Sequence, residues 1–175
     1  EIKTKVTSIF AFALTLAYLF SIHQPIDLLR TVVFFGSMFL FDLTTTAINN
    51  YMDTKTNDQI LQFNRRTALV MIYLLFILAT VLGIWLALMT DVVVLLLGAL
   101  CFFCGVVYSY GPIPISRQPW GEVISGLFYG LLIPFILLYV NMPEGTYLTL
   151  ELSWETVNLS FRVYPMLTVL LLAVA

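Results

Sequence analysis

A dense polar segment between two long apolar runs carries the residues of this chain that could do chemistry. It occupies residues 49–58, and the apolar runs 31–48 and 67–89 flank it. Its members are Asn49, Asn50, Tyr51, Met52, Asp53, Thr54, Lys55, Thr56, Asn57 and Asp58. Carboxylate and carboxamide oxygens suit Mg²⁺, which keeps several waters and is shared between carboxylates and substrate phosphates. The segment therefore predicts a site that binds a diphosphate through Mg²⁺.

The expected roles follow from the side-chain types. Basic side chains near a metal site neutralise the negative charge of the phosphates that the metal does not neutralise. We therefore expect Lys55, Arg65 and Arg66 to contact the diphosphate, and place Asn50 with them among the substrate-binding residues. The expected metal ligands are Asn49, Asp53, Asn57 and Asp58, and of these Asn49, Asp53 and Asp58 are the expected catalytic residues.

The apolar run before this segment carries a polar stripe of its own. At roughly 100° per residue, Asn49, Thr46 and Asp42 all lie within about 40° of Asp53 around a helix. Asp42 lies well inside the apolar run, where an uncompensated carboxylate costs several kcal/mol, so it should face a bundle interior or a cavity. Alternatively, Asp42 and the neighbouring threonines merely bond an adjacent helix.

The elements that hold these residues are expected to be membrane-spanning helices. The chain is 61% hydrophobic and only 10% charged, which is typical of polytopic membrane proteins. Apolar runs that approach or reach the roughly 20 residues needed for a span cover residues 6–21, 31–48, 67–89, 92–110 and 123–140. A sixth run begins near Val163 and reaches Ala175 too soon to cross. We expect a single all-α transmembrane domain over residues 1–175, with five spans and the start of a sixth, that is part of a longer polypeptide.

Positive charge indicates the orientation in the membrane. With the N-terminus and residues 49–58 in the cytoplasm, the basic residues on the inner side are Lys3, Lys5, Lys55, Arg65, Arg66 and Arg117, and only Arg30 and Arg162 lie outside. We expect a multi-pass protein of the plasma membrane. The near-neutral net charge of -2 leaves no basic face for nucleic acid.

A diphosphate site in contact with lipid points to a long isoprenoid diphosphate as substrate. Ionisation of its allylic C–O bond needs the charge of the departing diphosphate neutralised and water excluded. Aromatic faces can stabilise the allylic cation, and the candidates are Tyr51, Tyr108 and Tyr110.

The polar segment at residues 49–58 resembles a motif of a known protein family. Asn49 to Asp53, followed by Asn57 and Asp58, look like the first aspartate-rich motif of the UbiA superfamily of intramembrane aromatic prenyltransferases. Residues 1–5, the segment from Tyr108 to Pro112, and the pair Gly121 and Glu122 resemble its menaquinone branch. The resemblance implies a helical fold of about nine spans. It also implies Mg²⁺-dependent transfer of a polyprenyl group from its diphosphate to an aromatic acceptor like 1,4-dihydroxy-2-naphthoate, in quinone biosynthesis.

The chain departs from the family pattern in three places. Asn50 replaces a carboxylate, and Asn57 occupies the strict second aspartate position, so Asp58 is the expected second carboxylate. The second aspartate-rich motif of the family is expected beyond Ala175, so residues 1–175 alone are expected to be inactive.

Two other functions fit parts of the sequence. A membrane transferase acting on cytidine-diphosphate alcohols would need a D-G pair, and the sequence contains none. A transporter or non-catalytic membrane protein could use the polar segment as an ion path. It would be expected to show interrupted helices near the midplane, whereas the apolar runs here read as uninterrupted.

Overall fold

The computed structural model of the chain describes residues 2–56, 64–110, 115, 118, 120–152 and 156–174. Among these, the side chains of residues 2–4, 55, 56, 151, 152, 164 and 174 lie outside the description. The helices are α1 (Ile2–Ser21), α2 (Leu28–Thr56), α3 (Arg65–Met89), α4 (Val92–Ser109), α5 (Gly121–Leu127), the π-helical turn η2 (Phe128–Leu132), α6 (Ile133–Asn141) and α7 (Val163–Val174). Two strands, β1 (Leu148–Leu152) and β2 (Val157–Phe161), form a hairpin.

The predicted all-α membrane architecture is confirmed. In the described part of the chain, four helical segments are long and apolar enough to cross a membrane: Leu28–Thr54, Arg65–Met89, Val92–Ser109 and Gly121–Asn141. The predicted first span is also helical, but the apolar stretch of α1, Lys5–Ser21, is shorter than these four. α7 begins where the sixth run was predicted.

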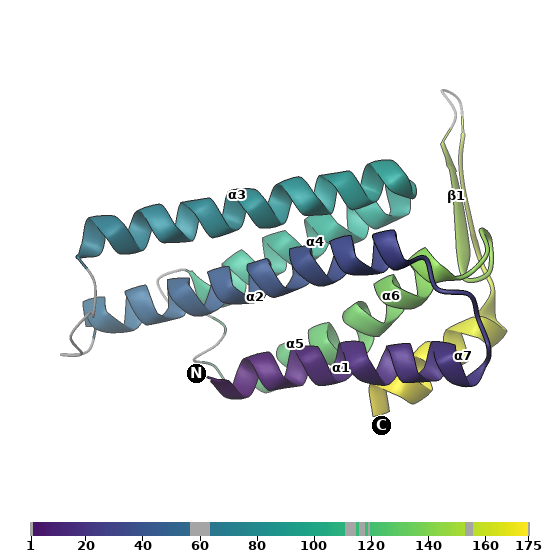
Figure 1. Ribbon diagram of the computed structural model, residues 1–175, viewed down its shortest axis with the longest axis horizontal. Coiled ribbons are helices and arrows are strands. Elements are labelled where there is room, and N and C mark those ends of the chain that lie inside the picture. The colour runs from purple at the N-terminus through teal and green to yellow at the C-terminus, as the bar shows by residue number, and fades with distance from the viewer. Residues whose placement is uncertain are drawn as a thin grey trace.

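The helices run roughly alongside one another, so their ends gather at two ends of the bundle (Figure 1). We call one the Asp53 end, where α1 begins, α2 ends and α3 begins. We call the other the Asn141 end, where α1, α3 and α6 end. α2 and α3 pack against each other in antiparallel directions. The two polar segments predicted to meet, the end of α2 and the start of α3, therefore lie at the same end.

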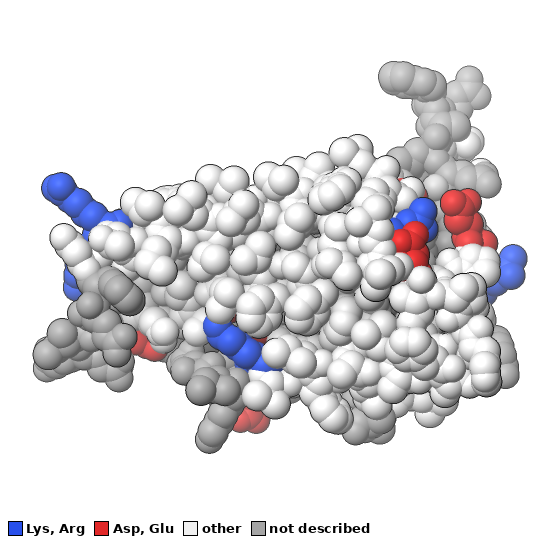
Figure 2. Space-filling model, in the orientation of Figure 1, with Lys and Arg blue, Asp and Glu red and all other residues white. Residues whose placement is uncertain are grey.

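The outer surface of the bundle is apolar, as a lipid-facing surface must be. On α3, Leu74, Ile77, Leu78 and Val81 are all more than half exposed. Charged side chains gather toward the left part and the right-hand end of the face in Figure 2, with a broad uncharged surface between them. A water-soluble protein rarely exposes so large an apolar patch, so lipid is the solvent that this surface fits.

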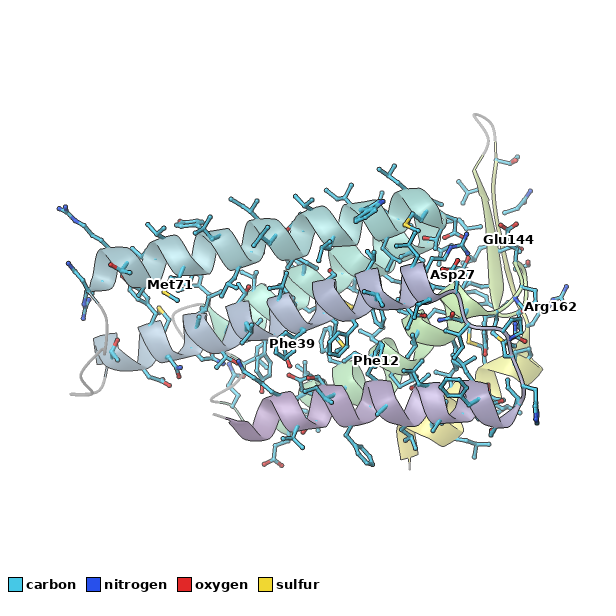
Figure 3. The ribbon with its side chains drawn as sticks, viewed as in Figure 1. Phe12, Asp27, Phe39, Met71, Glu144 and Arg162 are labelled. Atoms are coloured by element: carbon cyan, nitrogen blue, oxygen red, sulfur yellow. The ribbon has the colours of Figure 1, made fainter. Side chains whose placement is uncertain are left out.

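Aromatic packing joins α1 to α2 in the interior. Phe12 of α1 packs against Phe34 and Phe35, with ring centroids 6.2 and 4.9 Å apart. Figure 3 shows Phe12 and Phe39 pointing into the space between these two helices. The buried polar side chains nearby are mostly small hydroxyls, such as Thr15 and Ser37, which bond backbone carbonyls. Such residues allow close helix packing in a membrane.

The structure departs from the sequence prediction in two places. The run 123–140 is not uninterrupted, because the π-helical turn η2 separates α5 from α6. The segment between the fifth and sixth apolar runs contains the β1–β2 hairpin. In the turn before the hairpin, Thr146 N donates to the Pro143 carbonyl at 3.1 Å. Gly145 has φ of 75°, which glycine adopts without a steric penalty.

Candidate functional site

A cavity of about 550 Å³ lies inside the helical bundle. All the helices contribute to its wall, and the lining is predominantly apolar, with rings such as Phe34, Phe41 and Phe102. The polar or charged lining residues are Thr7, Ser37, Asp42, Thr45, Thr46, Asn49, Tyr108, Glu122, Ser125 and Tyr129. A largely apolar pocket with a few convergent polar groups is the usual form of a small-molecule site.

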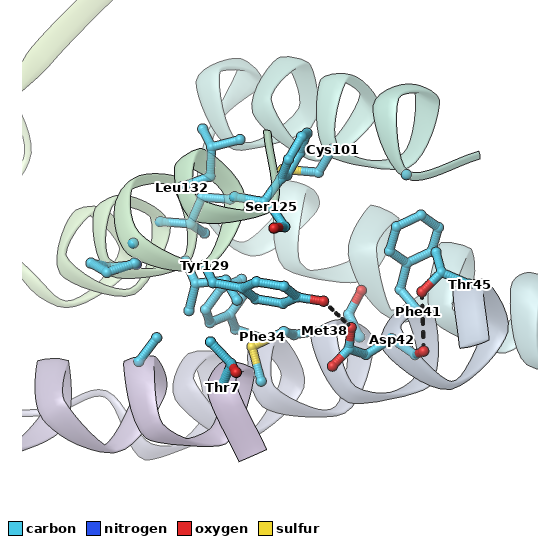
Figure 4. A pocket seen from close by; sticks show the side chains of 18 of the residues that line it. Thr7, Phe34, Met38, Phe41, Asp42, Thr45, Cys101, Ser125, Tyr129 and Leu132 are labelled. Atoms are coloured by element: carbon cyan, nitrogen blue, oxygen red, sulfur yellow. Dashed lines mark hydrogen bonds between the residues drawn. The ribbon is translucent and has the colours of Figure 1, made fainter. Parts of the chain in front are cut away.

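Asp42 is the buried acidic group of this cavity. Its side chain is only 8% exposed, and it accepts hydrogen bonds from two other elements. Ser8 Oγ of α1 donates to Oδ2 at 2.6 Å, and Tyr129 Oη of η2 donates to Oδ1 at 2.9 Å. Figure 4 shows the Tyr129 ring reaching across the cavity to the Asp42 carboxylate. Both carboxylate oxygens therefore have a donor, which offsets part of the cost of burying Asp42 in an apolar wall.

The threonines beside Asp42 are satisfied within α2 itself. Thr45 Oγ1 and Thr46 Oγ1 both donate to the Asp42 carbonyl, at 3.1 and 2.9 Å, and Thr44 Oγ1 donates to the Leu40 carbonyl at 2.8 Å. Such bonds let hydroxyls sit in an apolar helix without a partner on another helix. The alternative that Asp42 and these threonines merely bond an adjacent helix therefore fits Asp42, which bonds α1 and η2, but not Thr45 or Thr46.

The polar stripe predicted on α2 faces the cavity over most of its length. Asp42, Thr46 and Asn49 all line it, whereas Asp53 does not. Asp53 is half-buried and lies one helical turn beyond Asn49, toward the Asp53 end of the bundle. The stripe therefore leads from the interior of the cavity toward the helix end that carries Asp53.

The bundle is thus a polytopic apolar scaffold around a cavity whose polar stripe ends in an Asn-x-x-x-Asp pair. A model of the UbiA prenyltransferase family matches residues 9–175. The chain belongs to this family. Its members transfer isoprenyl groups to aromatic acceptors, and they generally use Mg²⁺ through aspartate-rich motifs. A search of curated proteins and a search of solved structures each found no match.

The remaining site residues predicted for this UbiA family chain divide into three groups. Tyr108 lines the cavity near the end of α4. Four others lie near the Asp53 end without lining the cavity: Asn50, Tyr51, Arg65 and Arg66, of which all but Tyr51 are exposed. Lys55 belongs to α2, but its side chain is outside the description, and Asn57 and Asp58 lie outside the described residues.

The donor set for the Mg²⁺ that UbiA enzymes generally use is partly present. Asn49 and Asp53 lie one turn apart on α2 and offer a carboxamide and a carboxylate oxygen. The described residues contain no group of three or more His, Cys, Asp or Glu side chains placed to hold a metal ion. A pair of oxygen ligands fits Mg²⁺ because this ion commonly completes its octahedron with waters and substrate phosphates.

Sequence reasoning missed Tyr129, which lines the UbiA cavity, and Ser8, which bonds the cavity residue Asp42. Both bond Asp42, from 87 and 34 residues away in the chain. A tyrosine inside an apolar run was a usable signal, because a buried phenol needs a hydrogen-bond partner. The same reasoning identifies no particular partner, since it does not say which helices lie together.

Proposed function

We propose that this protein transfers a polyprenyl group from an isoprenoid diphosphate to an aromatic acceptor like 1,4-dihydroxy-2-naphthoate, with Mg²⁺ as cofactor, in quinone biosynthesis. The observation that carries the proposal is the continuity of the stripe on α2. It lines an apolar cavity at Asp42, Thr46 and Asn49 and continues to Asp53 at the helix end. A substrate with a hydrocarbon tail and a charged head needs this arrangement.

The head of the substrate is proposed to lie at the Asp53 end. Asn49 and Asp53 would hold Mg²⁺ with the diphosphate, and Asn57 and Asp58 are proposed as further ligands. Mg²⁺ bound there would neutralise part of the charge that develops on the diphosphate as the C–O bond breaks. The exposed guanidinium groups of Arg65 and Arg66 begin α3 at this same end, and with Lys55 they are proposed to balance the remaining charge.

The prenyl tail is proposed to occupy the apolar part of the cavity. Phe34, Met38 and Leu86 line it there, on the far side of Asp42 from Asn49. Asp42 lies about 16 Å along the helix axis from Asp53, so a chain extending inward from the diphosphate passes this carboxylate. The hydrogen bonds from Ser8 and Tyr129 make that passage compatible with a hydrocarbon by occupying both carboxylate oxygens.

The reaction requires an ionised allylic carbon to meet an aromatic ring away from water. The C–O bond breaks with its electron pair leaving on the diphosphate. An aromatic carbon then forms the new C–C bond. The ring loses a proton from that carbon or, where the carbon bears a carboxylate, carbon dioxide. The Tyr108 ring lines the cavity and could stabilise the allylic cation. The naphthoate assignment rests on the segment around Tyr108 and on Glu122, which also lines the cavity.

We further propose that the Asp53 end faces the cytoplasm from the plasma membrane. Lys5, Arg65 and Arg66 all lie toward this end, and cytoplasmic loops carry an excess of such residues. Reactive cysteines introduced at Arg66 and at Asp27, in a background without the two native cysteines, would be labelled by a membrane-impermeant reagent from opposite sides of sealed cells. Labelling at Asp27→Cys alone in intact cells is the expected outcome.

The test of the proposed reaction uses the full-length protein in lipid nanodiscs. It is incubated with polyprenyl diphosphates of several chain lengths and with either 1,4-dihydroxy-2-naphthoate or 4-hydroxybenzoate, and products are identified by mass spectrometry. We expect a prenylated naphthalene product that requires Mg²⁺ and disappears with EDTA. Transfer to 4-hydroxybenzoate alone would overturn the naphthoate assignment but retain prenyl transfer.

The transporter alternative makes a different prediction in sealed liposomes. It predicts ion flux through the protein without formation of a prenylated product. The π-helical turn η2 is an interruption of a spanning segment, but Phe128–Leu132 stays helical and the backbone is not unwound there. Ion flux in the absence of any prenyl transfer would overturn the proposed function and favour a transporter.

A further inference from the structure

The β1–β2 hairpin is amphipathic, and its two faces are set by the strand register. The antiparallel pairs are Leu148 with Phe161, Leu150 with Leu159, and Leu152 with Val157. Directly opposed residues share a face, and alternate residues along a strand share it too. Among the described side chains, that face carries five apolar residues, Leu148, Leu150, Val157, Leu159 and Phe161. The intervening pair, Thr149 with Ser160, and Asn158 of β2 belong to the other face.

The apolar face is directed toward the helices at its base. Leu148 is only 8% exposed and belongs to the hydrophobic core together with Phe135 and Tyr147, and Leu150 packs against that core. Arg162 N donates to the Tyr147 carbonyl at 2.8 Å and closes the base of the hairpin. Since Leu148 faces the helices, the residues that share its face are directed to the same side.

The same face is unprotected along β2. Val157, Leu159 and Phe161 are 67, 51 and 59% exposed, because the helices cover Leu148 of β1 but not these residues of β2. An isolated two-stranded hairpin is at best marginally stable in water and needs its apolar face covered. The apolar side chains of β2 therefore require a partner on the side where the helices lie.

The position of the hairpin identifies that partner. It projects at the Asn141 end and runs across the axis of the helices, and Figure 3 places Glu144 and Arg162 near its base (Figures 1 and 3). Helices that cross a bilayer run roughly along its normal, so a hairpin that runs across them lies along the membrane surface. β1 contacts α4, whose Leu95 and Leu96 near this end are about half exposed on the apolar outer surface. The apolar face thus continues the lipid-facing surface of the bundle.

We propose that the β1–β2 hairpin lies in the membrane interface at the Asn141 end, with its apolar face in contact with the acyl chains of the lipid. Its outer strand edges carry backbone N–H and C=O groups without a strand partner, which hydrocarbon does not satisfy. The hairpin therefore rests at headgroup depth, where water and headgroups reach the polar face of Thr149 and Ser160. This inference is independent of the enzymatic activity.

The experiment exploits the alternation along β2. Single cysteines are introduced at each of residues 157–161 in a Cys101→Ala, Cys104→Ala background of the full-length protein and labelled with the fluorophore NBD in nanodiscs. We expect blue-shifted emission at 157, 159 and 161, and loss of most of it when the nanodiscs contain lipid with a nitroxide near the headgroup end of the acyl chain. Labels at 158 and 160 are the matched controls and should report water.

Each outcome decides the proposal. Emission typical of water at all five positions would overturn it, because the apolar face would then lie away from lipid. Shielding at 157, 159 and 161 without quenching by nitroxide lipid, or a disulfide formed between two Leu159→Cys copies, would assign the face to a protein partner and also overturn it. Three separate positions on the apolar face keep the test valid if one labelled variant fails to fold.

Discussion

Tyr129 of the π-helical turn donates a 2.9 Å hydrogen bond to Asp42 of α2, and Ser8 of α1 donates to the same carboxylate. The carboxylate thus ties three elements together in the wall of the cavity. A π-helical turn widens the helix and re-aims its side chains, and such turns are frequent at functional sites. The interruption of the fifth span thus carries the tyrosine that bonds Asp42.

Removing the tyrosine hydroxyl tests this bond. We expect Tyr129→Phe to lower the free energy of unfolding by about 1–2 kcal/mol, because a buried carboxylate loses one of its donors. Unfolding can be followed by circular dichroism during SDS titration in mixed micelles. Tyr73→Phe is the control, since Tyr73 is 64% exposed on α3, and an equal loss there would contradict the assignment.

Asp53 is expected to be required for turnover. In the full-length protein, Asp53→Asn should lower kcat for prenyl transfer by roughly 10²–10³, the usual loss when one group that stabilises the developing charge is removed. Raising the Mg²⁺ concentration should recover part of that loss. Asp27→Asn changes an exposed aspartate at the opposite end and should leave kcat unchanged. Full activity of the Asp53→Asn protein would contradict the proposed metal site.

Gly105 is expected to set the width of the cavity between α2 and α4. A methyl group there would meet the Phe41 ring inside van der Waals contact, and Phe41 stacks on Phe102 with centroids 4.1 Å apart. Displacing these rings in Gly105→Ala should cost about 1–3 kcal/mol of stability. Because both rings line the cavity, KM for long polyprenyl diphosphates should also rise.

Gly98→Ala is the matched control for that substitution. Gly98 lies on the same helix and also lines the cavity, but a methyl group there meets nothing within 4 Å. Alanine favours a helix over glycine, so this variant should be unchanged or slightly more stable. Comparable loss in both variants would mean that the effect comes from the helix backbone and not from Phe41.

Asn141, at the end of α6, hydrogen-bonds the α1–α2 connection and the first turn of α2. It is 7% exposed, its Oδ1 accepts from Asp27 N at 2.8 Å, and its Nδ2 donates to Thr31 Oγ1 at 3.0 Å. Asn141→Ala should lower the free energy of unfolding by about 2 kcal/mol, since buried partners are left unsatisfied. The exposed Asn158 provides the control in Asn158→Ala, and faster amide exchange at residues 22–27 only in Asn141→Ala would locate the loss.

The spans and the polar stripe on α2 could be predicted from particular residues. The apolar runs 31–48, 67–89 and 92–110 predict helices, because a single segment in lipid can satisfy its backbone hydrogen-bonding groups only as a helix. Asp42, Thr46 and Asn49 could be placed on one stripe because the helical period is a local property. The β1–β2 hairpin was missed, since its pairing depends on contacts between separate strands.

By itself, the sequence determined that this is a helical membrane protein with an Asn49-x-x-x-Asp53 pair at the end of a span, and hence its resemblance to the UbiA prenyltransferases. Those features follow from hydrophobic length and from spacing along one helix. Only the tertiary structure decided that Ser8 and Tyr129 hydrogen-bond Asp42, that the Phe41 ring packs against Gly105, and that β2 exposes an apolar face. Such pairings depend on which helices and strands lie together, and that choice results from packing over the whole chain.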